Sequence, residues 1–427
     1  MIDKMNFDVE SLGEPKIDSP MKNVQFLSKE TKVLFEPKLE EIKKKFEAGI
    51  EPAAFTIAGP REKIYFDPTK LRCGIVTCGG LCPGINDVIR AIVFSLYHHY
   101  GVRHIFGFQY GYEGMVPKFK HPVIDLDPEI VEDLHEKGGT VLHSSRGPQN
   151  VSDQVDTLER MNIGILFTIG GDGTLRGARD IAEEVKRRGL KISVIGIPKT
   201  IDNDISFVQQ SFGFETAISE AKSAIYSAHV EANGAKRGIG LVKLMGRHSG
   251  FIAANATLAT SDVNFCLIPE VKFSMQSLFD ALEERFKRKN HAVIVVGEGA
   301  GQDLFEDKRE FDKSGNLIFH DIGTYLKNSI NDYFKEKGEP INIKYIDPSY
   351  IIRSVPANPH DSVLCLLLGH NAVHAGMSGN TNMLVGSWNR RYVHVPIPAA
   401  VSKRKKINPK GSLWNSVLAT TGQPVLK

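Results

Sequence analysis

Short hydrophobic runs alternate with longer amphipathic stretches along most of this chain of 427 residues. The runs "RCGIVT" at 72–77, "IGILFTI" at 163–169 and "ISVIGI" at 192–197 each lead into a loop rich in glycine or polar residues. Runs of this length, alternating with helical patterns, predict a parallel, doubly wound α/β sheet. Because ligands of such sheets bind outside the carboxyl ends of the strands, we expect these three loops to form a site.

A second α/β region begins near residue 211. A helical pattern at 218–230 precedes apolar runs within 238–251, 263–271 and 291–303. Since a single domain rarely exceeds about 250–300 residues, we expect two domains. The charged segment 303–315 is predicted to be a solvated excursion.

The amino-acid composition limits which partners and which cell compartment we expect. The chain has 53 Lys and Arg against 50 Asp and Glu, a net charge of +3, which favours neither a nucleic-acid nor a membrane partner. No apolar run approaches the roughly 18 residues of a membrane span, and the first residues lack the apolar region of a signal peptide. Five cysteines, an odd number, are typical of a reducing compartment. These features predict a cytoplasmic protein.

Two clusters of reactive side chains are interpreted as structural. Cys73, Cys78 and Cys82 lie close together but have no suitably spaced fourth ligand, so we expect packing rather than zinc. The basic run "SKRKK" at 402–406 is predicted to be a solvated surface patch, and contact with a phosphate-bearing effector is the alternative.

The first loop, "CGGLCPGIND" at 78–87, carries Gly79, Gly80 and Gly84. Glycines at a strand-to-helix turn present backbone N–H groups that bind phosphate, although a tight packing turn needs the same residues. The chain has no G-x-x-x-x-G-K-[ST] sequence, and the glycine spacing does not fit the dinucleotide fingerprint.

The second loop, "GGDGT" at 170–174, exposes Asp172 among three glycines. A carboxylate in that setting suits a hydrated Mg²⁺ shared with substrate phosphates. The motif also occurs in NAD kinases and diacylglycerol kinases, so it indicates phosphoryl transfer from a nucleotide; a structural turn is the alternative.

The third loop, "PKTIDND" at 198–204, places Lys199, Asp202 and Asp204 just after a strand. By itself it is more typical of a polar turn. Together with "SSRGP", "LMGRHSG", "GEG" and "KYIDPSYIIR", however, the three loops resemble the 6-phosphofructokinases in both motif and order, from about residue 71 to 398. The chain is most similar to the longer ATP-dependent branch, with an N-terminal extension and a lysine before "TIDND".

The resemblance implies two similar, mainly parallel α/β domains with the active site in the cleft between them, and a homotetramer. It implies an N-terminal extension at 1–70, a nucleotide-binding domain at 71–212 with 353–398, a sugar-phosphate-binding domain at 213–352 and a C-terminal tail at 399–427. The first helix lacks the second arginine of the bacterial effector site, because Phe94 follows Arg90 by four residues. An intact bacterial effector site is therefore not expected.

The resemblance also implies catalytic roles. Asp202 would be the general base for the 1-hydroxyl of fructose 6-phosphate, with Thr200 and Asp204 orienting it. Arg146 and Arg247 would stabilise the transferring phosphoryl group. The implied ATP-binding residues, with Asp172 as the Mg²⁺ ligand, are Gly79, Gly80, Tyr112, Arg146, Gly171, Asp172, Gly173, Thr174 and Lys199. Tyr112 matches a position that stacks on adenine, but core packing is the alternative.

The implied substrate-binding residues are Thr200, Asp202, Asp204, Arg237, Met245, Gly246, Arg247, Glu298, Lys344, Tyr350 and Arg353. Lys344 and Tyr350 replace an arginine and a histidine of the shorter bacterial pattern. Arg237 matches only approximately an arginine that the family takes from a neighbouring subunit.

Three other functions are kept as alternatives. A pyrophosphate-dependent enzyme would have aspartate at the position of Gly173, where this chain leaves room for a nucleotide. A catalytically silent sugar-phosphate sensor would have lost Asp202 or Asp172. A nicotinamide oxidoreductase would change the absorbance of a reduced cofactor on turnover.

Overall fold

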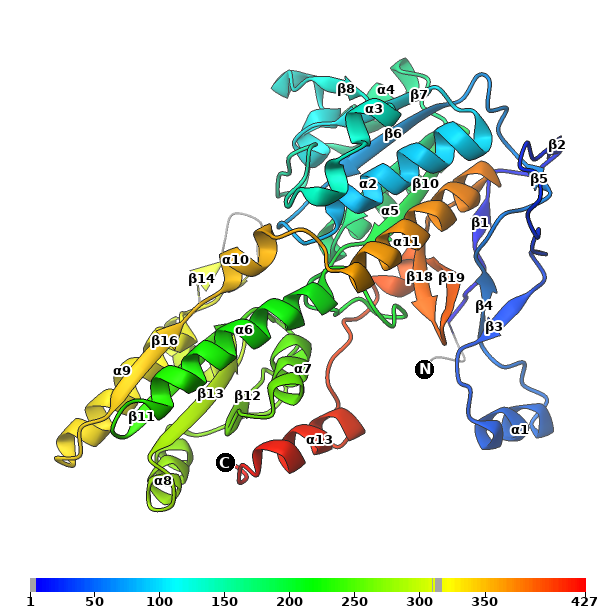
Figure 1. The fold of residues 1–427 in the computed structure, drawn as a ribbon. Helices are drawn as coiled ribbons and strands as arrows, with labels where there is room; N and C mark the ends of the chain where they lie inside the picture. The colour runs from blue at the N-terminus through cyan, green and yellow to red at the C-terminus, as the bar shows by residue number, and fades with distance from the viewer. Residues whose placement is uncertain (1–4, 309, 312–316) are drawn as a thin grey trace. The chain divides into compact units, whose positions relative to one another are not determined.

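The computed structural model describes residues 5–308, 310–311 and 317–427 (Figure 1). Part of the predicted solvated excursion at 303–315 therefore lies outside the described residues. The chain divides into two compact units. The first comprises Met1–Ile201, Ile205–Gly213 and Val355–Lys403, and the second comprises Asp202–Asp204, Phe214–Ser354 and Arg404–Lys427.

The first unit is built on a nine-stranded sheet. In spatial order its strands are β3 (Lys32–Leu34), β4 (Ala54–Ile57), β19 (Arg391–Pro396), β18 (Met383–Trp388), β10 (Ser193–Pro198), β9 (Ile165–Gly170), β6 (Arg72–Thr77), β7 (His104–Phe108) and β8 (Val123–Asp125). The five strands from β18 to β7 are parallel, and antiparallel strands complete both edges. The predicted parallel α/β fold is confirmed.

Helices cover both faces of the central strands. The helices of this unit are α1 (Leu39–Glu47), α2 (Ile85–Phe94), α3 (Pro128–Val131), α4 (Val151–Arg160), α5 (Asp172–Arg187), α11 (Pro359–Met377) and α12 (Ile397–Ala400). Ile75, Phe167 and Ile195 belong to one core cluster with α2 and α11, whereas their strand neighbours belong to another with α4 and α5. Because successive strand side chains point to opposite faces, this double burial explains the nearly continuous apolar runs.

The N-terminal segment is part of the first unit's core. Its strands β3 and β4 join the large sheet through β19. Two short antiparallel pairs, β1 (Glu10–Ser11) with β17 (Asn380–Thr381) and β2 (Ile17–Asp18) with β5 (Lys63–Ile64), also fasten it. An aromatic cluster holds it further: Phe7, Phe35, Phe55, Phe207 and Trp388. This segment therefore contributes apolar packing as well as polar surface.

The second unit has a parallel sheet in the order β12 (Phe265–Leu267), β13 (His291–Gly297), β11 (Gly238–Leu244) and β16 (Asn342–Ile346). The helix predicted at 218–230 is confirmed as part of the longer α6 (Phe214–Asn233). The helix α6 packs on the face that includes Gly240, where a Cβ would come within 2.5 Å of the Ala228 carbonyl oxygen. Its neighbour α7 (Phe251–Thr260) contacts α6 and β13, while α8 (Met275–Phe286) and α9 (Ile322–Glu336) share a core cluster with the opposite face.

The last residues of the chain, from Arg404, belong to the second unit. Helix α13 (Ser412–Thr421) buries Trp414 and Val417, and Leu426 joins the core. All five cysteines are buried. Among the described residues, no helix is both long and apolar enough to cross a bilayer.

Candidate active site

Three loops of the first unit follow strands that are adjacent in its sheet. Strands β6, β9 and β10 are parallel neighbours, so the loops after Thr77, Gly170 and Pro198 leave the same edge of the sheet. Gly84 is the N-cap of α2 and has a φ of 95°, and a Cβ there would lie 2.6 Å from the Cys365 sulfur. The glycine is therefore required by both backbone conformation and close packing.

The Gly79 loop is tied to the segment that carries Arg146. The N–H of Gly79 donates to the Ser145 carbonyl at 3.0 Å, and the Ser144 hydroxyl donates to the Gly79 carbonyl at 2.6 Å. The N–H of Gly79 is therefore used within the protein in this structure. This pairing also brings the exposed Arg146 near the first glycine loop.

Lys199 lies where these loops meet. Its side chain is only 6% exposed, and its ammonium donates to the Gly80 carbonyl at 2.6 Å. Its own N–H donates to the Gly170 carbonyl at 2.9 Å. Removing an ammonium from water costs free energy unless anionic or carbonyl oxygens surround it. The buried position of Lys199 therefore favours anion binding.

Asp172 is the first residue of α5, after the N-cap Gly171. Its carboxylate is 19% exposed and accepts a bond from the Arg176 Nε at 3.2 Å. The described residues contain no group of three or more His, Cys, Asp or Glu side chains able to enclose a metal. One accessible carboxylate fits Mg²⁺, which commonly takes one or two protein carboxylates and completes its shell with water and phosphate oxygens.

Gly173 and Thr174 continue the first turn of α5. A Cβ at Gly173 would meet no atom within 4 Å, so the space beside this glycine is open. The Thr174 carbonyl accepts a bond from the Tyr112 hydroxyl at 2.6 Å. The Tyr112 ring is buried against Gly177 in the core. This arrangement favours core packing for Tyr112 and speaks against stacking on adenine.

In the second unit, Asp202 lies beside the "MGR" turn. Its Oδ2 accepts a long bond of 3.5 Å from the N–H of Arg247, and its carbonyl accepts one from the Ser249 hydroxyl at 3.3 Å. Burial, followed by the negative charges of Asp204 and Glu298, raises the pKa of Asp202 to about 7. A carboxyl with this pKa has the protonation behaviour required of a general base near neutral pH.

The "MGR" and "GEG" turns fit closely together. The N–H of Gly299 donates to the Gly246 carbonyl at 3.2 Å, and a Cβ at Gly299 would lie 2.0 Å from the Arg247 carbonyl oxygen. Met245 is buried beneath this contact. Only glycine at 299 permits such an approach, so Arg247 and Glu298 have a fixed backbone relation.

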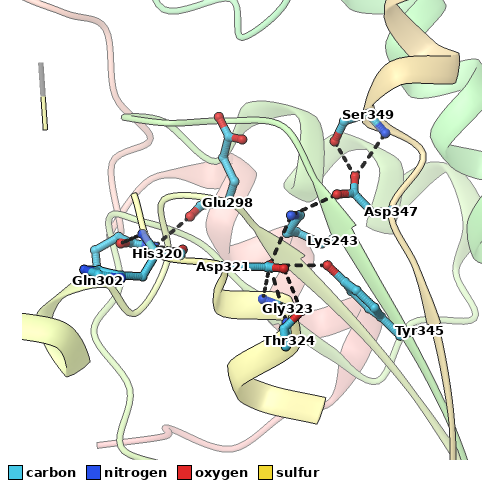
Figure 2. Close-up of polar contacts among 10 residues, drawn as sticks. All are labelled: Lys243, Glu298, Gln302, His320, Asp321, Gly323, Thr324, Tyr345, Asp347 and Ser349. Atoms are coloured by element: carbon cyan, nitrogen blue, oxygen red, sulfur yellow. Dashed lines mark hydrogen bonds and ion pairs between the residues drawn. The ribbon is translucent and has the colours of Figure 1, made fainter. Parts of the chain in front are cut away.

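Glu298 directly follows β13 and has a half-buried carboxylate that points away from Gln302 (Figure 2). Burial raises its pKa, although the positive charges of Arg247, Lys243 and Arg353 act in the opposite direction. The second unit thus gathers Asp202, Asp204, Arg247, Glu298 and Arg353 within electrostatic range of one another.

A charged cluster that the sequence analysis missed supports this group. The Lys243 ammonium lies 3.1 Å from Asp321 Oδ1 and 2.9 Å from Asp347 Oδ2 (Figure 2). Asp347 in turn accepts bonds from the N–H and hydroxyl of Ser349. Burial lowers the pKa of Lys243, but the bonds to Asp347 and Asp321 outweigh it and raise the pKa overall. Lys243 therefore links β11 to the start of α10 (Ser349–Ser354) and of α9.

The remaining predicted substrate residues are spread over the second unit. On α10, Tyr350 is 80% exposed and the Arg353 guanidinium lies 5.0 Å from its ring centre. Lys344 lies within β16 with its ammonium 3.8 Å from Glu231 Oε2. Arg237 precedes β11, at the opposite end from Met245, and pairs with Glu339 at 2.7 Å. The structure thus does not bring Arg237 or Lys344 next to Glu298 within this unit.

The basic run at 402–406 is not simply a solvated patch, which corrects the prediction for two of its residues. The N–H of Lys405 donates to the Asp204 carbonyl at 2.8 Å, and its ammonium donates to Asn203 Oδ1 at 3.0 Å. Arg404 NH1 lies 3.4 Å from Asp204 Oδ2. A run of cations in a sequence gives no sign of such partners 200 residues away.

Comparisons with known proteins agree with this architecture. A family model described as Phosphofructokinase matches residues 72–376. An ATP-dependent 6-phosphofructokinase of Borreliella burgdorferi is 50% identical over 439 residues, covering 99% of this chain and 98% of the relative. One of Amycolatopsis methanolica is 45% identical over 434 residues, covering 97% and 94%.

A solved pyrophosphate-dependent phosphofructokinase of Marinobacter aquaeolei has a TM-score of 0.69 and 18% identity, covering 83% of this chain and 92% of that one. At that identity it shows the shared fold alone. The extent of the family match and of the two close relatives leads to one conclusion: this chain belongs to the phosphofructokinase family.

Proposed function

We propose that this protein transfers the γ-phosphoryl group of ATP to the 1-hydroxyl of fructose 6-phosphate, giving fructose 1,6-bisphosphate and ADP. The observation that carries the proposal is the near full-length similarity to two proteins named ATP-dependent 6-phosphofructokinase. Two groups of residues support it. The group in the first unit, Lys199, Asp172 and Arg146, suits a nucleotide's phosphates, and the group in the second unit, around Asp202, contains a base. The reaction requires both groups to act on the same pair of substrates.

In the proposed reaction, Asp202 accepts the proton of the 1-hydroxyl as that oxygen forms a bond to the γ-phosphorus. The bond from the γ-phosphorus to the leaving oxygen of ADP breaks in the same displacement. Asp204 and Thr200 orient Asp202 and the hydroxyl. Arg247 and Arg146 balance the negative charge that spreads over the transferring group.

The donor is held by the first unit in this proposal. Lys199 supplies a fixed positive charge for the donor's phosphates, near the backbone of Gly79 and Gly80. Asp172 holds Mg²⁺, which neutralises phosphate charge when bound. The open space at Gly173 favours ATP over pyrophosphate, because a nucleotide's α-phosphate needs room there.

The acceptor is held by the second unit. Glu298 accepts bonds from sugar hydroxyls beside Met245 and Gly246, while Arg353 binds the 6-phosphate. The exposed Tyr350 is available to the same ligand. Lys344 and Arg237 serve the sugar phosphate only if a neighbouring subunit presents them, as in the homotetramer that we propose.

The same proposal assigns nucleotide binding to residues 71–212 with 353–398 and sugar-phosphate binding to 213–352, in a cytoplasmic enzyme without nucleic-acid or membrane partners. A coupled assay for fructose 1,6-bisphosphate tests it, with ATP and pyrophosphate compared as donors. We expect turnover with ATP and none with pyrophosphate. Turnover with pyrophosphate alone would favour the other donor class, and no turnover with either would favour a sugar-phosphate sensor.

A further inference from the structure

Arg404 and Lys405 hold the turn that carries the proposed base. Lys405 contacts this turn twice, through its backbone N–H to Asp204 and through its ammonium to Asn203. Arg404 adds an ion pair to the Asp204 carboxylate. All three contacts join residues about 200 positions apart within the second unit. The turn is therefore anchored at Asn203 and at Asp204 by one short segment.

Burial makes these contacts energetically important. The Asp204 side chain is only 8% exposed, and a buried carboxylate beside a second acid is costly unless a cation balances it. The Lys405 ammonium also lies 5.2 Å from the ring centre of Phe251, and burial lowers the pKa of Lys405 to about 7. A solvated surface lysine would have neither feature. The segment is therefore built into the structure around Asp202.

We propose that Arg404 and Lys405 are positioning residues for phosphoryl transfer: Lys405 fixes the turn that carries Asp202, and the charge of Arg404 favours the ionised form of Asp202. This inference rests on the proposed role of Asp202 as the base. Neither residue needs to touch a substrate. Their effect passes through Asn203 and Asp204.

The charges facing Asp202 come from several elements. Asp204 on the same turn and Glu298 directly after β13 raise its pKa, while the N–H of Arg247 after β11 and the charge of Arg404 lower it. His248 does not add a cation near neutral pH, because burial, Arg404 and Arg247 lower its pKa to about 4. Lys405, the other basic group at this turn, donates a hydrogen bond to Asn203, and its charge also interacts with that of Asp204.

The charge of Arg404 is tested by the pH dependence of kcat/KM for fructose 6-phosphate. Wild type, Arg404→Met and Arg404→Lys are compared with Lys406→Met, which removes an equal charge from an exposed neighbour. The acid limb is the fall of kcat/KM at low pH. In Arg404→Met its midpoint should move to a pH that is higher by several tenths of a unit, which corresponds to a roughly two- to threefold loss of activity at a fixed acidic pH. Arg404→Lys should reverse most of this shift because it keeps the positive charge. Lys406→Met should resemble wild type.

The anchoring by Lys405 is tested by kcat and KM at a pH above the acid limb. Lys405→Met keeps the backbone bond to Asp204 but loses the bond to Asn203, so kcat should fall by about tenfold while both KM values stay within about threefold. Lys405→Arg, which retains a donor, should recover part of kcat. Thermal unfolding of each variant establishes that it is folded before its kinetics are compared.

Two results would overturn the inference. One is an acid limb of Arg404→Met that coincides with those of wild type and Lys406→Met. The other is a rise in KM without a shift of the limb or a fall in kcat, since that pattern indicates direct substrate binding. Both results require an active wild type. A wild type that makes no fructose 1,6-bisphosphate from ATP would instead contradict the proposed function itself.

Discussion

The two candidate groups of residues are built by different means. In the first unit, glycines at the ends of adjacent parallel strands shape the loops, and few charged side chains are added: Lys199, Asp172 and Arg146. In the second, side chains from distant segments form charge networks, such as Lys243 with Asp321 and Asp347. The difference teaches that a phosphate-binding loop is local in sequence, whereas the surroundings of a base are assembled by the fold.

This contrast predicts different sensitivities to substitution. Added bulk or charge at a glycine of the first unit should affect the donor. Loss of a charged group in the second should affect the acceptor or the proton transfer. The substitutions below test that separation.

The largest effect is expected at Asp202. Asp202→Asn keeps the shape of the side chain but removes the proton acceptor, so kcat should fall by roughly 10²–10⁴-fold. Affinity for fructose 6-phosphate should stay within an order of magnitude, as measured by steady-state kinetics and by direct binding. A near-normal kcat would remove Asp202 from the role of base.

A smaller but more selective effect is expected at Gly173. Its Cβ direction is open, so Gly173→Asp should fold normally and place a carboxylate where a nucleotide's phosphate is expected. Repulsion between these charges should lower kcat/KM for ATP by roughly 10²-fold, with little change in KM for fructose 6-phosphate. Gly173→Ala is the matched control and should remain close to wild type. Unaltered ATP kinetics in Gly173→Asp would mean that the donor lies elsewhere.

Asp172 should mainly govern the requirement for metal. The Asp172 carboxylate is the one protein ligand proposed for Mg²⁺. Asp172→Asn should therefore raise the Mg²⁺ concentration for half-maximal activity by about tenfold and lower kcat. Titration of activity with Mg²⁺ at constant ATP measures this shift. An unchanged titration would indicate that "GGDGT" is a structural turn without a role in metal binding.

The smallest effect is expected at Lys243, which contacts no proposed ligand residue directly. Lys243→Met leaves Asp321 and Asp347 without their shared cation, so the start of α10 should lose its fixed position and KM for fructose 6-phosphate should rise about three- to fivefold. KM for ATP should not change, so the two KM values should respond differently to this substitution. Equal changes in both KM values would indicate general destabilisation instead.

Much of the first unit could be predicted from sequence. The apolar runs at 72–77, 163–169 and 192–197 correspond to β6, β9 and β10, and their loops leave one edge of the sheet. This was possible because burial on both faces gives an unbroken apolar run, and a tight turn requires glycine. The N–H of Gly79 and the ring of Tyr112 were harder to place, because their partners, Ser145 and Gly177, are set by packing.

The second unit was predicted less completely. Its helix near 218–230 and its parallel strands follow from periodicity, but the lysine at 243 looks like any polar residue within a strand. Likewise, nothing in "SKRKK" distinguishes Lys405, which contacts Asn203, from Lys406, which is exposed. Such pairings depend on three-dimensional neighbours rather than on local pattern. A search for cations near the predicted base could find them only after the fold is known.

The most direct test of the central claim, that Asp202 is a base tuned by its buried surroundings, is the pH dependence of kcat/KM for fructose 6-phosphate. Because burial, Asp204 and Glu298 raise the pKa of Asp202 to about 7, the fraction able to accept a proton falls as the pH drops below that value. We predict a wild-type acid limb with its midpoint near this pKa, and its absence from the residual activity of Asp202→Asn. A flat wild-type profile from about pH 5.5 to about pH 8, or an acid limb that persists in Asp202→Asn, would contradict this role.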